Sequence, residues 1–158
     1  MRLALYQPDI PQNLGAVLRI AACFSAAVDV IEPCGFLLTE KAVRRAAMDY
    51  ATRVEVARHA GWAAFLSDPH RKAGKLVLVE TDAEASLYDF AFTGRETLLF
   101  GRESAGSPPE AYAAAAQAVR IPMAPGARSL NVAVCAGVAL AEARRQLALR
   151  FPSPRWES

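Results

Sequence analysis

The sequence predicts a single α/β domain, residues 1–158, built on a parallel sheet with helices on both faces. Short apolar runs alternate with helical segments along the 158 residues, which is the order of elements in α/β proteins. The runs are continuous stretches of Val, Leu, Ile and Phe, as expected of strands that are buried on both faces. Proline is confined to the junctions between segments, and glycine lies mostly there, so we expect neither a linker nor a second domain.

Each strand is predicted where a short apolar run stops at a turn. In chain order the predicted strands are Leu3–Tyr6, Val28–Ile31, Val54–Ala57, Leu76–Glu80, Thr97–Phe100 and Val119–Ile121. Helices are predicted in the alanine-rich segments between the strands, because alanine has the highest helix propensity. In chain order the predicted helices are Asn13–Ser25, Thr39–Tyr50, Trp62–Leu66, Pro109–Gln117 and Ser129–Arg150.

Polar residues at several junctions are suited to begin helices. Asn13 and Ser129 are each interpreted as the N-cap of the helix that follows. The segment Ser107-Pro108-Pro109-Glu110 fits a capping box with proline in the first helical turn. A capped N-terminus still offers backbone N–H groups to a ligand, so Ser129 can serve as a cap, as a binding residue or as both.

The last predicted helix is rich in small residues and carries Gly137 near its middle. A glycine inside a helix costs roughly 1 kcal/mol relative to alanine, so Gly137 requires a packing reason. We interpret the small residues as a helix–helix contact between two copies of the chain and therefore expect a homodimer. The alternative is that the alanines reflect helix propensity alone.

Composition and cysteine content argue against several classes of protein. The formal net charge is only +2, so binding of nucleic acid would need a local basic patch or a surface that spans a dimer. Cys23, Cys34 and Cys135 are odd in number and lack paired spacing, so we expect neither a disulfide framework nor a metal site. The opening segment reaches Gln7 and Pro8 too soon for a signal peptide, and no apolar run is long enough to span a membrane. We therefore expect a cytoplasmic protein.

Several common catalytic motifs are missing from the sequence. No G-x-G-x-x-G follows the first predicted strand, and there is no Walker loop and no G-x-S-x-G elbow. His59 and His70 lie in polar segments without an obvious nucleophile, so we interpret both as surface residues. An ordinary dinucleotide fold and a serine hydrolase are not expected.

Three polar turns are the strongest candidates for a binding site. Phe100–Gly106 and Ile121–Asn131 each leave a predicted strand, pass through Gly, Pro and Ser, and then open a helix. Asn13–Arg19 adds a polar turn and a cation near the start of the chain. Strand-to-helix turns of parallel sheets bind ligands because their N–H groups are free and glycine allows close approach. The sequence thus predicts a small-molecule site where these turns meet.

The three turns resemble the three motifs of the SPOUT class of RNA methyltransferases. The first motif, N-x-G-x-x-x-R, comprises Asn13, Gly15 and Arg19. The second motif, F-G-x-E-x-x-G, comprises Phe100, Gly101, Glu103 and Gly106. The third motif, I-P-M followed by S-L-N, comprises Ile121-Pro122-Met123 and Ser129-Leu130-Asn131. The resemblance covers nearly the whole chain. It is strongest to the small single-domain tRNA ribose 2′-O-methyltransferases that act on the wobble nucleotide. It also implies a trefoil knot near the C-terminus.

Further segments carry the narrower resemblance, namely Leu5–Asn13, Ile31–Phe36 and Arg44–Tyr50. Two residues depart from the pattern of that subgroup. Ser107 stands where leucine is usual, and Arg102 follows Gly101, where it could alter the rim of the pocket.

The resemblance implies S-adenosyl-L-methionine as the methyl donor, and no metal. The donor would lie bent between the loops that follow the strands ending near Val79, Phe100 and Ile121. An apolar slot edged with backbone donors and acceptors would hold the adenine. The residues that match by type and by motif position are Val79, Gly101, Gly106, Ile121, Met123, Ser129 and Leu130.

The catalytic residues implied by the resemblance are Asn13, Arg19, Glu103, Ser129 and Asn131. Arg19 would lie near the acceptor ribose. A free guanidinium has a pKa above about 12, so we expect Arg19 to clamp an RNA phosphate and to stabilise charge on the reacting oxygen rather than act as a base. Glu103 would orient the loop, pairing with Arg19 or with the last helix. Ser129 and Asn131 would fix the second loop and the substrate sugar. A solvated helix arginine is the alternative for Arg19.

A basic stretch provides a candidate RNA-binding surface in addition to Arg19. It comprises Lys41, Arg44, Arg45, Arg53 and Arg58. Contact with the phosphates of a tRNA anticodon stem–loop is one interpretation, and a solvated helix face is the other.

The resemblance therefore implies a homodimeric tRNA ribose 2′-O-methyltransferase that acts on cytidine or uridine at the wobble position, with the RNA site built from both subunits. Two alternatives stay open: methylation of another RNA position, and an RNA-binding dimer that holds the cofactor without turnover.

Overall fold

The protein is built around a single parallel sheet. The computed structural model describes residues 1–39 and 53–150. Within these residues, seven parallel strands form one sheet in the order β3-β2-β1-β6-β4-β7-β5. The strands are β1 (Arg2–Tyr6), β2 (Ala27–Ile31), β3 (Val56–His59), β4 (Leu76–Val79), β5 (Ala85–Ser86), β6 (Thr97–Phe100) and β7 (Gln117–Arg120).

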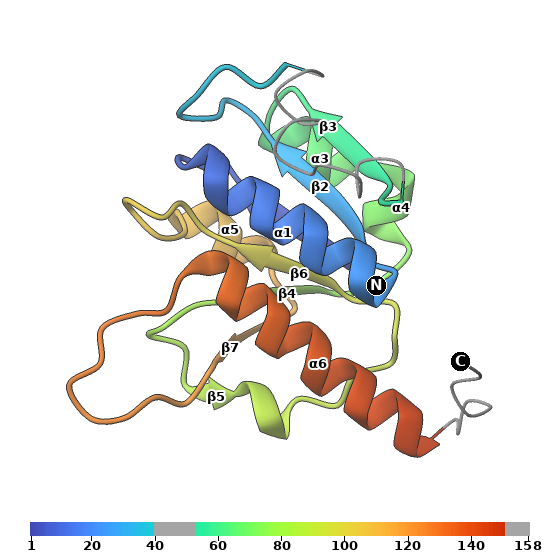
Figure 1. Ribbon diagram of the computed structural model, residues 1–158, viewed down its shortest axis with the longest axis vertical. Coiled ribbons are helices and arrows are strands. Elements are labelled where there is room, and N and C mark those ends of the chain that lie inside the picture. The colour runs from blue at the N-terminus through green and yellow to red at the C-terminus, as the bar shows by residue number, and fades with distance from the viewer. Residues whose placement is uncertain (40–52, 151–158) are drawn as a thin grey trace.

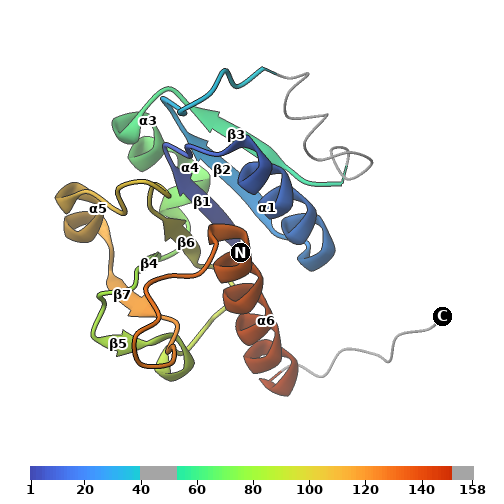
Figure 2. The same ribbon diagram turned by 60° about the vertical axis from the view of Figure 1, so that its left-hand side comes forward.

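Helices cover both faces of the sheet, as Figures 1 and 2 show. The long helices α1 and α6 lie side by side on one face, and the shorter α3 and α5 lie on the other. The helices are α1 (Pro11–Phe24), α3 (Trp62–Ser67), α4 (Pro69–Lys72), α5 (Pro109–Ala114) and α6 (Val132–Arg150), with a 3-10 turn η2 (Leu87–Asp89). The predicted α/β architecture is confirmed.

The central strands send alternate side chains into two separate cores. In β1, Leu3 and Leu5 pack with α1 and α6, whereas Ala4 and Tyr6 pack on the side of α3 and α5. β6 divides in the same way, with Leu99 on the latter side. Because successive strand residues point to opposite faces, a strand covered on both faces must be apolar throughout. This explains the continuous apolar runs in the sequence.

The predicted elements agree with the observed ones most closely at the centre of the sheet. Thr97–Phe100 is observed as predicted, whereas β3 begins two residues later and β7 two residues earlier than expected. β5, α4 and η2 were not predicted, because each is very short. The predicted helix Thr39–Tyr50 lies almost entirely outside the described residues.

The predicted helix caps are wrong. α1 begins at Pro11, with Asn13 already inside the helix. α6 begins at Val132, and Asn131 rather than Ser129 caps it, because the Asn131 Oδ1 accepts from the Ala133 N–H at 2.8 Å. α5 follows Pro108 without a side-chain cap, so the capping box from Ser107 does not form. Pro109 occupies the first turn as expected.

The small residues of α6 have a packing partner within the chain. Their buried members, Ala133, Ala136, Ala139 and Ala143, lie in the core formed with α1. A Cβ added at Gly137 would lie 3.7 Å from the Ile20 Cδ1 of α1, an ordinary contact. Within its own chain Gly137 therefore has α1 as its neighbour, and the expected helix–helix contact between two copies stays a prediction.

His59 is buried rather than exposed, which corrects the surface interpretation. Its Nε2 lies 2.9 Å from the Asp29 Oδ1, and the Arg2 guanidinium lies 2.7 Å from the other oxygen of Asp29. Asp29 is fully buried on β2, so these two partners compensate its charge. His70 is exposed, as expected.

Candidate active site

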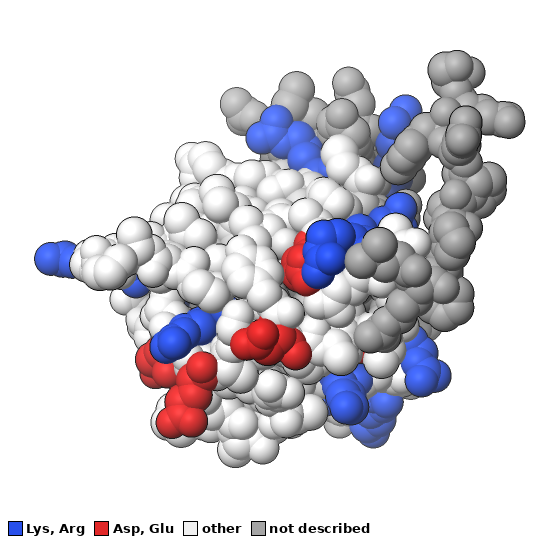
Figure 3. All heavy atoms as spheres, turned by 90° about the horizontal axis from the view of Figure 1, so that it is seen from below, with Lys and Arg blue, Asp and Glu red and all other residues white. Residues whose placement is uncertain are grey.

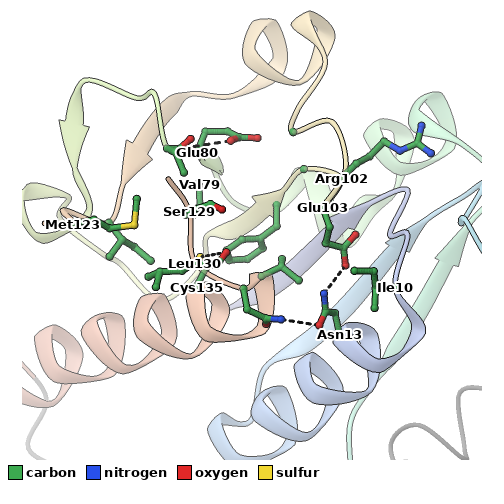
Figure 4. Close-up of a pocket in the computed structure, with 17 residues that line it drawn as sticks. Ile10, Asn13, Val79, Glu80, Arg102, Glu103, Met123, Ser129, Leu130 and Cys135 are labelled. Carbon is green, nitrogen blue, oxygen red and sulfur yellow. Dashed lines mark hydrogen bonds between the residues drawn. The ribbon is translucent and has the colours of Figure 1, made fainter. Parts of the chain in front are cut away.

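A cavity of about 450 Å³ lies at the carboxyl ends of β4, β6 and β7 (Figure 4). The first turn of α1 and the start of α6 form its other wall. This end of a parallel sheet is where α/β proteins bind ligands, and the volume is in the range of small-molecule sites. The three turns singled out in the sequence converge here.

Every residue predicted to bind the cofactor lines this pocket: Val79, Gly101, Gly106, Ile121, Met123, Ser129 and Leu130. They come from three separate segments, and Figure 4 shows Val79, Met123, Ser129 and Leu130 around the same hollow. Among the predicted catalytic residues, Asn13, Glu103, Ser129 and Asn131 also line it. The fold therefore brings together residues that lie up to 118 positions apart.

The loop after β6 is a closed turn that depends on two glycines. The Arg102 N–H donates to the Gly106 carbonyl at 3.0 Å, and the Gly106 N–H donates back to Arg102 at 2.8 Å. Gly106 has a φ of +67°, a conformation that favours glycine. A Cβ added at Gly101 would lie 2.5 Å from the Gly106 carbonyl carbon and 2.5 Å from the Ser107 Oγ. Only glycine fits at position 101 without displacing the loop.

Asp9 anchors this loop to the segment before α1. One carboxylate oxygen accepts from the N–H and the hydroxyl of Ser104, and the other accepts from the Arg102 guanidinium at 3.1 Å. The hydrogen bond from the Ser104 side chain is the largest influence that lowers the pKa of Asp9 below its ordinary value, and Arg102 adds to it. Arg102 also donates to Gln7, so this departure from the subgroup pattern strengthens the rim of the pocket.

A chain of hydrogen bonds joins all three motifs. Glu103 accepts from the Asn13 Nδ2 at 3.2 Å and from the Asp9 N–H at 2.8 Å. The Asn131 Nδ2 then donates to the Asn13 Oδ1 at 2.8 Å, and Figure 4 shows the continuous path. Asn13 is thus held at both ends of its amide. The expected pairing of Glu103 with Arg19 or with α6 is corrected, because its partners are Asn13 and Asp9.

Arg19 does not line the pocket of its own chain. It is exposed on α1, six residues beyond Asn13. Among the other predicted RNA-binding residues, Arg53 is exposed, and Arg44 and Arg45 lie outside the described residues. Arg58 pairs with Glu32 at 2.9 Å. Figure 3 shows a face with a broad uncharged area and most of its Lys and Arg side chains along the margin.

Sequence reasoning missed several residues of the pocket: Ile10, Glu80, Thr81, Val132 and Cys135. Glu80 and Thr81 directly follow β4, so the strand-end rule applied to Phe100 and Ile121 could have found them. Burial raises the pKa of the Cys135 thiol, as expected of a packed cysteine. Within residues 1–39 and 53–150, no group of three or more metal-ligating side chains could hold a metal ion, and no helix is long and apolar enough to cross a membrane.

Unpaired polar atoms cluster around the pocket. In the part of the chain that the structure describes, the Glu80 Oε1, the Arg102 Nε and the Ser107 Oγ are buried without a hydrogen-bond partner. Buried polar groups usually have partners, and unpaired ones call for an explanation such as a ligand. Of these three residues, Glu80 and Arg102 line the pocket, and within the described ranges only Arg102 has further hydrogen bonds to other side chains, those to Gln7 and Asp9.

Comparison with known proteins gives a consistent result. A profile of the SpoU rRNA Methylase family matches residues 1–141. A relative from Beijerinckia indica subsp. indica, named tRNA (cytidine(34)-2′-O)-methyltransferase, is 47% identical over 92% of this chain and 91% of its own. A relative of the same name from Escherichia coli (strain K12) is 34% identical over 93% of this chain and 94% of its own.

Solved structures agree in fold as well as in sequence. One, described as giving structural insights into the 2-OH methylation of C/U34 on tRNA, is similar with a TM-score of 0.86 and 43% identity, and the match covers 94% of this chain and 97% of that one. Another is the SpoU methyltransferase AviRb from Streptomyces viridochromogenes in complex with AdoMet, at a TM-score of 0.83 and 28% identity over 94% of this chain and 61% of that one. On the family profile and these identities together, the chain belongs to the SpoU rRNA methylase family.

Proposed function

We propose that the protein is an S-adenosylmethionine-dependent tRNA ribose 2′-O-methyltransferase whose acceptor is the wobble nucleotide, cytidine or uridine 34. The observation that carries the proposal is the pocket in which the three motif turns meet, joined through Glu103, Asn13 and Asn131. The family profile refers to rRNA, but the relatives that match almost end to end are named as tRNA enzymes. Their names support the wobble position as the target.

The lining of the pocket fits the methyl donor. Val79, Ile121 and Leu130 provide apolar surface for the adenine, and Gly101 lines the same pocket. The buried, unpaired Glu80 Oε1 offers an acceptor for a polar group of the donor. When bound, S-adenosylmethionine supplies a methyl group on a positively charged sulfur. No metal is needed for such a displacement.

The chain's own residues would position the acceptor oxygen in line with the methyl group, and such positioning can supply a large share of the rate acceleration. Asn131, fixed by Asn13 and by its cap on α6, lies at the edge where the ribose would enter, and Ser129 lies beside it on the same loop. Glu103 keeps Asn13 in place and is a positioning residue. Arg19 would hold an RNA phosphate and stabilise negative charge on the 2′-oxygen.

A homodimer would place Arg19 where it is needed. Because Arg19 lies outside its own chain's pocket, the proposal assigns it to an RNA site shared between two subunits. Exposed apolar residues near the starts of α1 and α6 favour such an association: Ile10, Leu130 and Val134 are each at least 40% exposed. A tRNA substrate also supports the expected cytoplasmic location.

Transfer of an isotope-labelled methyl group from S-adenosylmethionine to bulk tRNA tests the proposal. We expect label in tRNA as a ribose 2′-O-methyl group at nucleotide 34. Label at another position would support the alternative target, and binding of the cofactor without transfer would support a non-catalytic protein. Either result would overturn the assignment to the wobble nucleotide.

A further inference from the structure

The side chain of Glu80 adds a carboxylate to the pocket, and Glu80 belongs to none of the three motifs. It directly follows β4, a central strand, and lines the same cavity as Val79 and Ile121. Its backbone N–H donates to the Val119 carbonyl at 3.0 Å, which fixes the base of the side chain against β7. Figure 4 shows Glu80 beside Val79, on the wall of the pocket opposite Asn13.

The Glu80 carboxylate has little hydrogen bonding from the protein. Its Oε2 accepts from the Thr81 N–H at 3.3 Å, a long bond, and its buried Oε1 is without a partner among the described residues. An ionised carboxylate can accept about four hydrogen bonds, so most of its capacity is unused. Leaving such a group buried and unpaired is unfavourable unless a ligand or solvent satisfies it.

The loop after β6 packs against one side of this carboxylate. A Cβ added at Gly106 would lie 3.5 Å from the Glu80 Oε1 and 3.9 Å from the Oε2. The Gly106 backbone, with its φ of +67°, therefore covers the carboxylate closely. The carboxylate is confined between β4 and this loop, at the border of the apolar slot.

The geometry points to Glu80 as the acceptor for the ribose hydroxyls of the bound methyl donor, an inference that rests on the proposed function. Two oxygens of one carboxylate can accept from two adjacent hydroxyls, and an acidic residue past a strand end binds ribose in this way in dinucleotide folds. In S-adenosylmethionine the ribose is bonded directly to the adenine. When the adenine occupies the apolar slot, a carboxylate beside the slot therefore lies nearer to the ribose than to the methionine part of the donor.

Calorimetric titration of the full chain tests this assignment. S-adenosylmethionine, S-adenosylhomocysteine and the 2′-deoxy and 3′-deoxy forms of the latter are the ligands, and Glu80→Ala and Glu80→Gln are the variants. We expect Glu80→Ala to weaken binding of S-adenosylmethionine and S-adenosylhomocysteine alike, by about tenfold or more, as for a charge-assisted hydrogen bond. Glu80→Gln, which keeps one acceptor oxygen, should lose less.

The deoxy ligands separate a ribose contact from other effects. Each should bind the unmodified protein more weakly than S-adenosylhomocysteine, and this difference should shrink in Glu80→Ala, where the carboxylate is gone. The matched control is Glu84→Gln, an exposed acidic residue on the same connection outside the pocket, which should bind all ligands unchanged. Thermal unfolding of each variant verifies that it is folded.

Three results would overturn the inference. Loss of affinity for S-adenosylmethionine but not for S-adenosylhomocysteine would show that Glu80 acts on the charged sulfur. Unchanged binding in Glu80→Ala, or an undiminished penalty for the deoxy ligands, would show that Glu80 does not touch the ribose. Failure of the unmodified protein to bind any of these ligands would instead contradict the proposed function.

Discussion

At the scale of single residues, the pocket depends on a glycine with no room for a side chain. Gly101 leaves β6 directly beneath the turn closed by Arg102 and Gly106, and a Cβ there would lie 2.5 Å from backbone. Two of the three nearest atoms, the Gly106 carbonyl carbon and the Ser107 nitrogen, belong to the main chain, so the contact is relieved only when the loop moves.

Gly101→Ala should therefore weaken binding of S-adenosylmethionine by at least about tenfold, because the displaced loop lines the pocket. The matched control is Gly61→Ala, since a Cβ at Gly61 would meet nothing within 4 Å. Calorimetric titration compares the two variants. Equal affinities in both would show that the loop geometry does not govern cofactor binding.

The stability that Asp9 gives to this loop depends on pH. Its pKa is lowered in the folded protein by Ser104 and Arg102, so its stabilising effect is complete above the ordinary carboxyl pKa of about 3.9. That effect is lost as the pH falls through the lower, folded-state pKa.

Asp9→Asn should reduce the free energy of unfolding at pH 7 by about 1–2 kcal/mol, because the charged acceptor of Ser104 and Arg102 is lost. The difference from the unmodified protein should shrink as the pH falls below about 4. Urea denaturation across this range measures both. A difference that stays constant down to low pH would contradict a role for the Asp9 charge.

At the scale of elements, hydrogen bonds of Glu142, Arg145 and Gln146 connect α6 to the loop before β6. The Gln146 amide donates to the Phe90 carbonyl at 2.9 Å and accepts from the Phe92 N–H at 3.0 Å. Glu142 accepts from Gln146 and from Arg145, each at 2.8 Å. The hydrogen bond from Arg145, followed by that from Gln146, lowers the pKa of Glu142 to about 2.

Glu142→Gln should lower the free energy of unfolding at pH 7 by about 1–2 kcal/mol, since Arg145 is largely exposed and its contribution is screened. Because the pKa of Glu142 is depressed, the loss should disappear as the pH falls from about 4.5 to about 2. Denaturation at several pH values, with exposed Glu84→Gln as the control, tests this. A loss that persists at pH 2 would indicate packing rather than charge.

At the scale of the whole molecule, the position of Arg19 outside its own pocket predicts complementation between subunits. Arg19→Ala and Gly101→Ala should each be nearly inactive alone, the first through the RNA site and the second through the cofactor pocket. A mixed dimer would hold one site with both functional residues, so an equal mixture should recover about a quarter of the unmodified activity.

Methyl transfer after mixing and subunit exchange measures this recovery. A mixture of the Arg19→Ala variant with the unmodified protein, treated in the same way, serves as the reference for subunit exchange. Activity in the mixture no higher than the mean of the two separate variants would place Arg19 and the pocket in the same subunit or show that the protein is not a dimer.

How far the sequence predicts the molecule depends on the range of the interactions. The central strands follow from apolar runs, which are local patterns. The pocket residues follow from the glycine-rich turns together with the motifs that carry the resemblance. The burial of His59 could not be predicted in this way, because its partner Asp29 is joined to it only by the pairing of β2 with β3. The cap of α6 was misplaced because Ser129 and Asn131 are equally good cap residues by type. The trefoil knot, which the resemblance alone implies, stays a prediction.

The most direct test of the central claim is nucleoside-resolved mass spectrometry of tRNA from cells with and without the gene. Loss of the gene should remove the ribose 2′-O-methyl group from nucleotide 34, and the intact gene should restore it where the Gly101→Ala form does not. A wobble nucleotide that keeps its full level of 2′-O-methylation in cells without the gene would contradict the account.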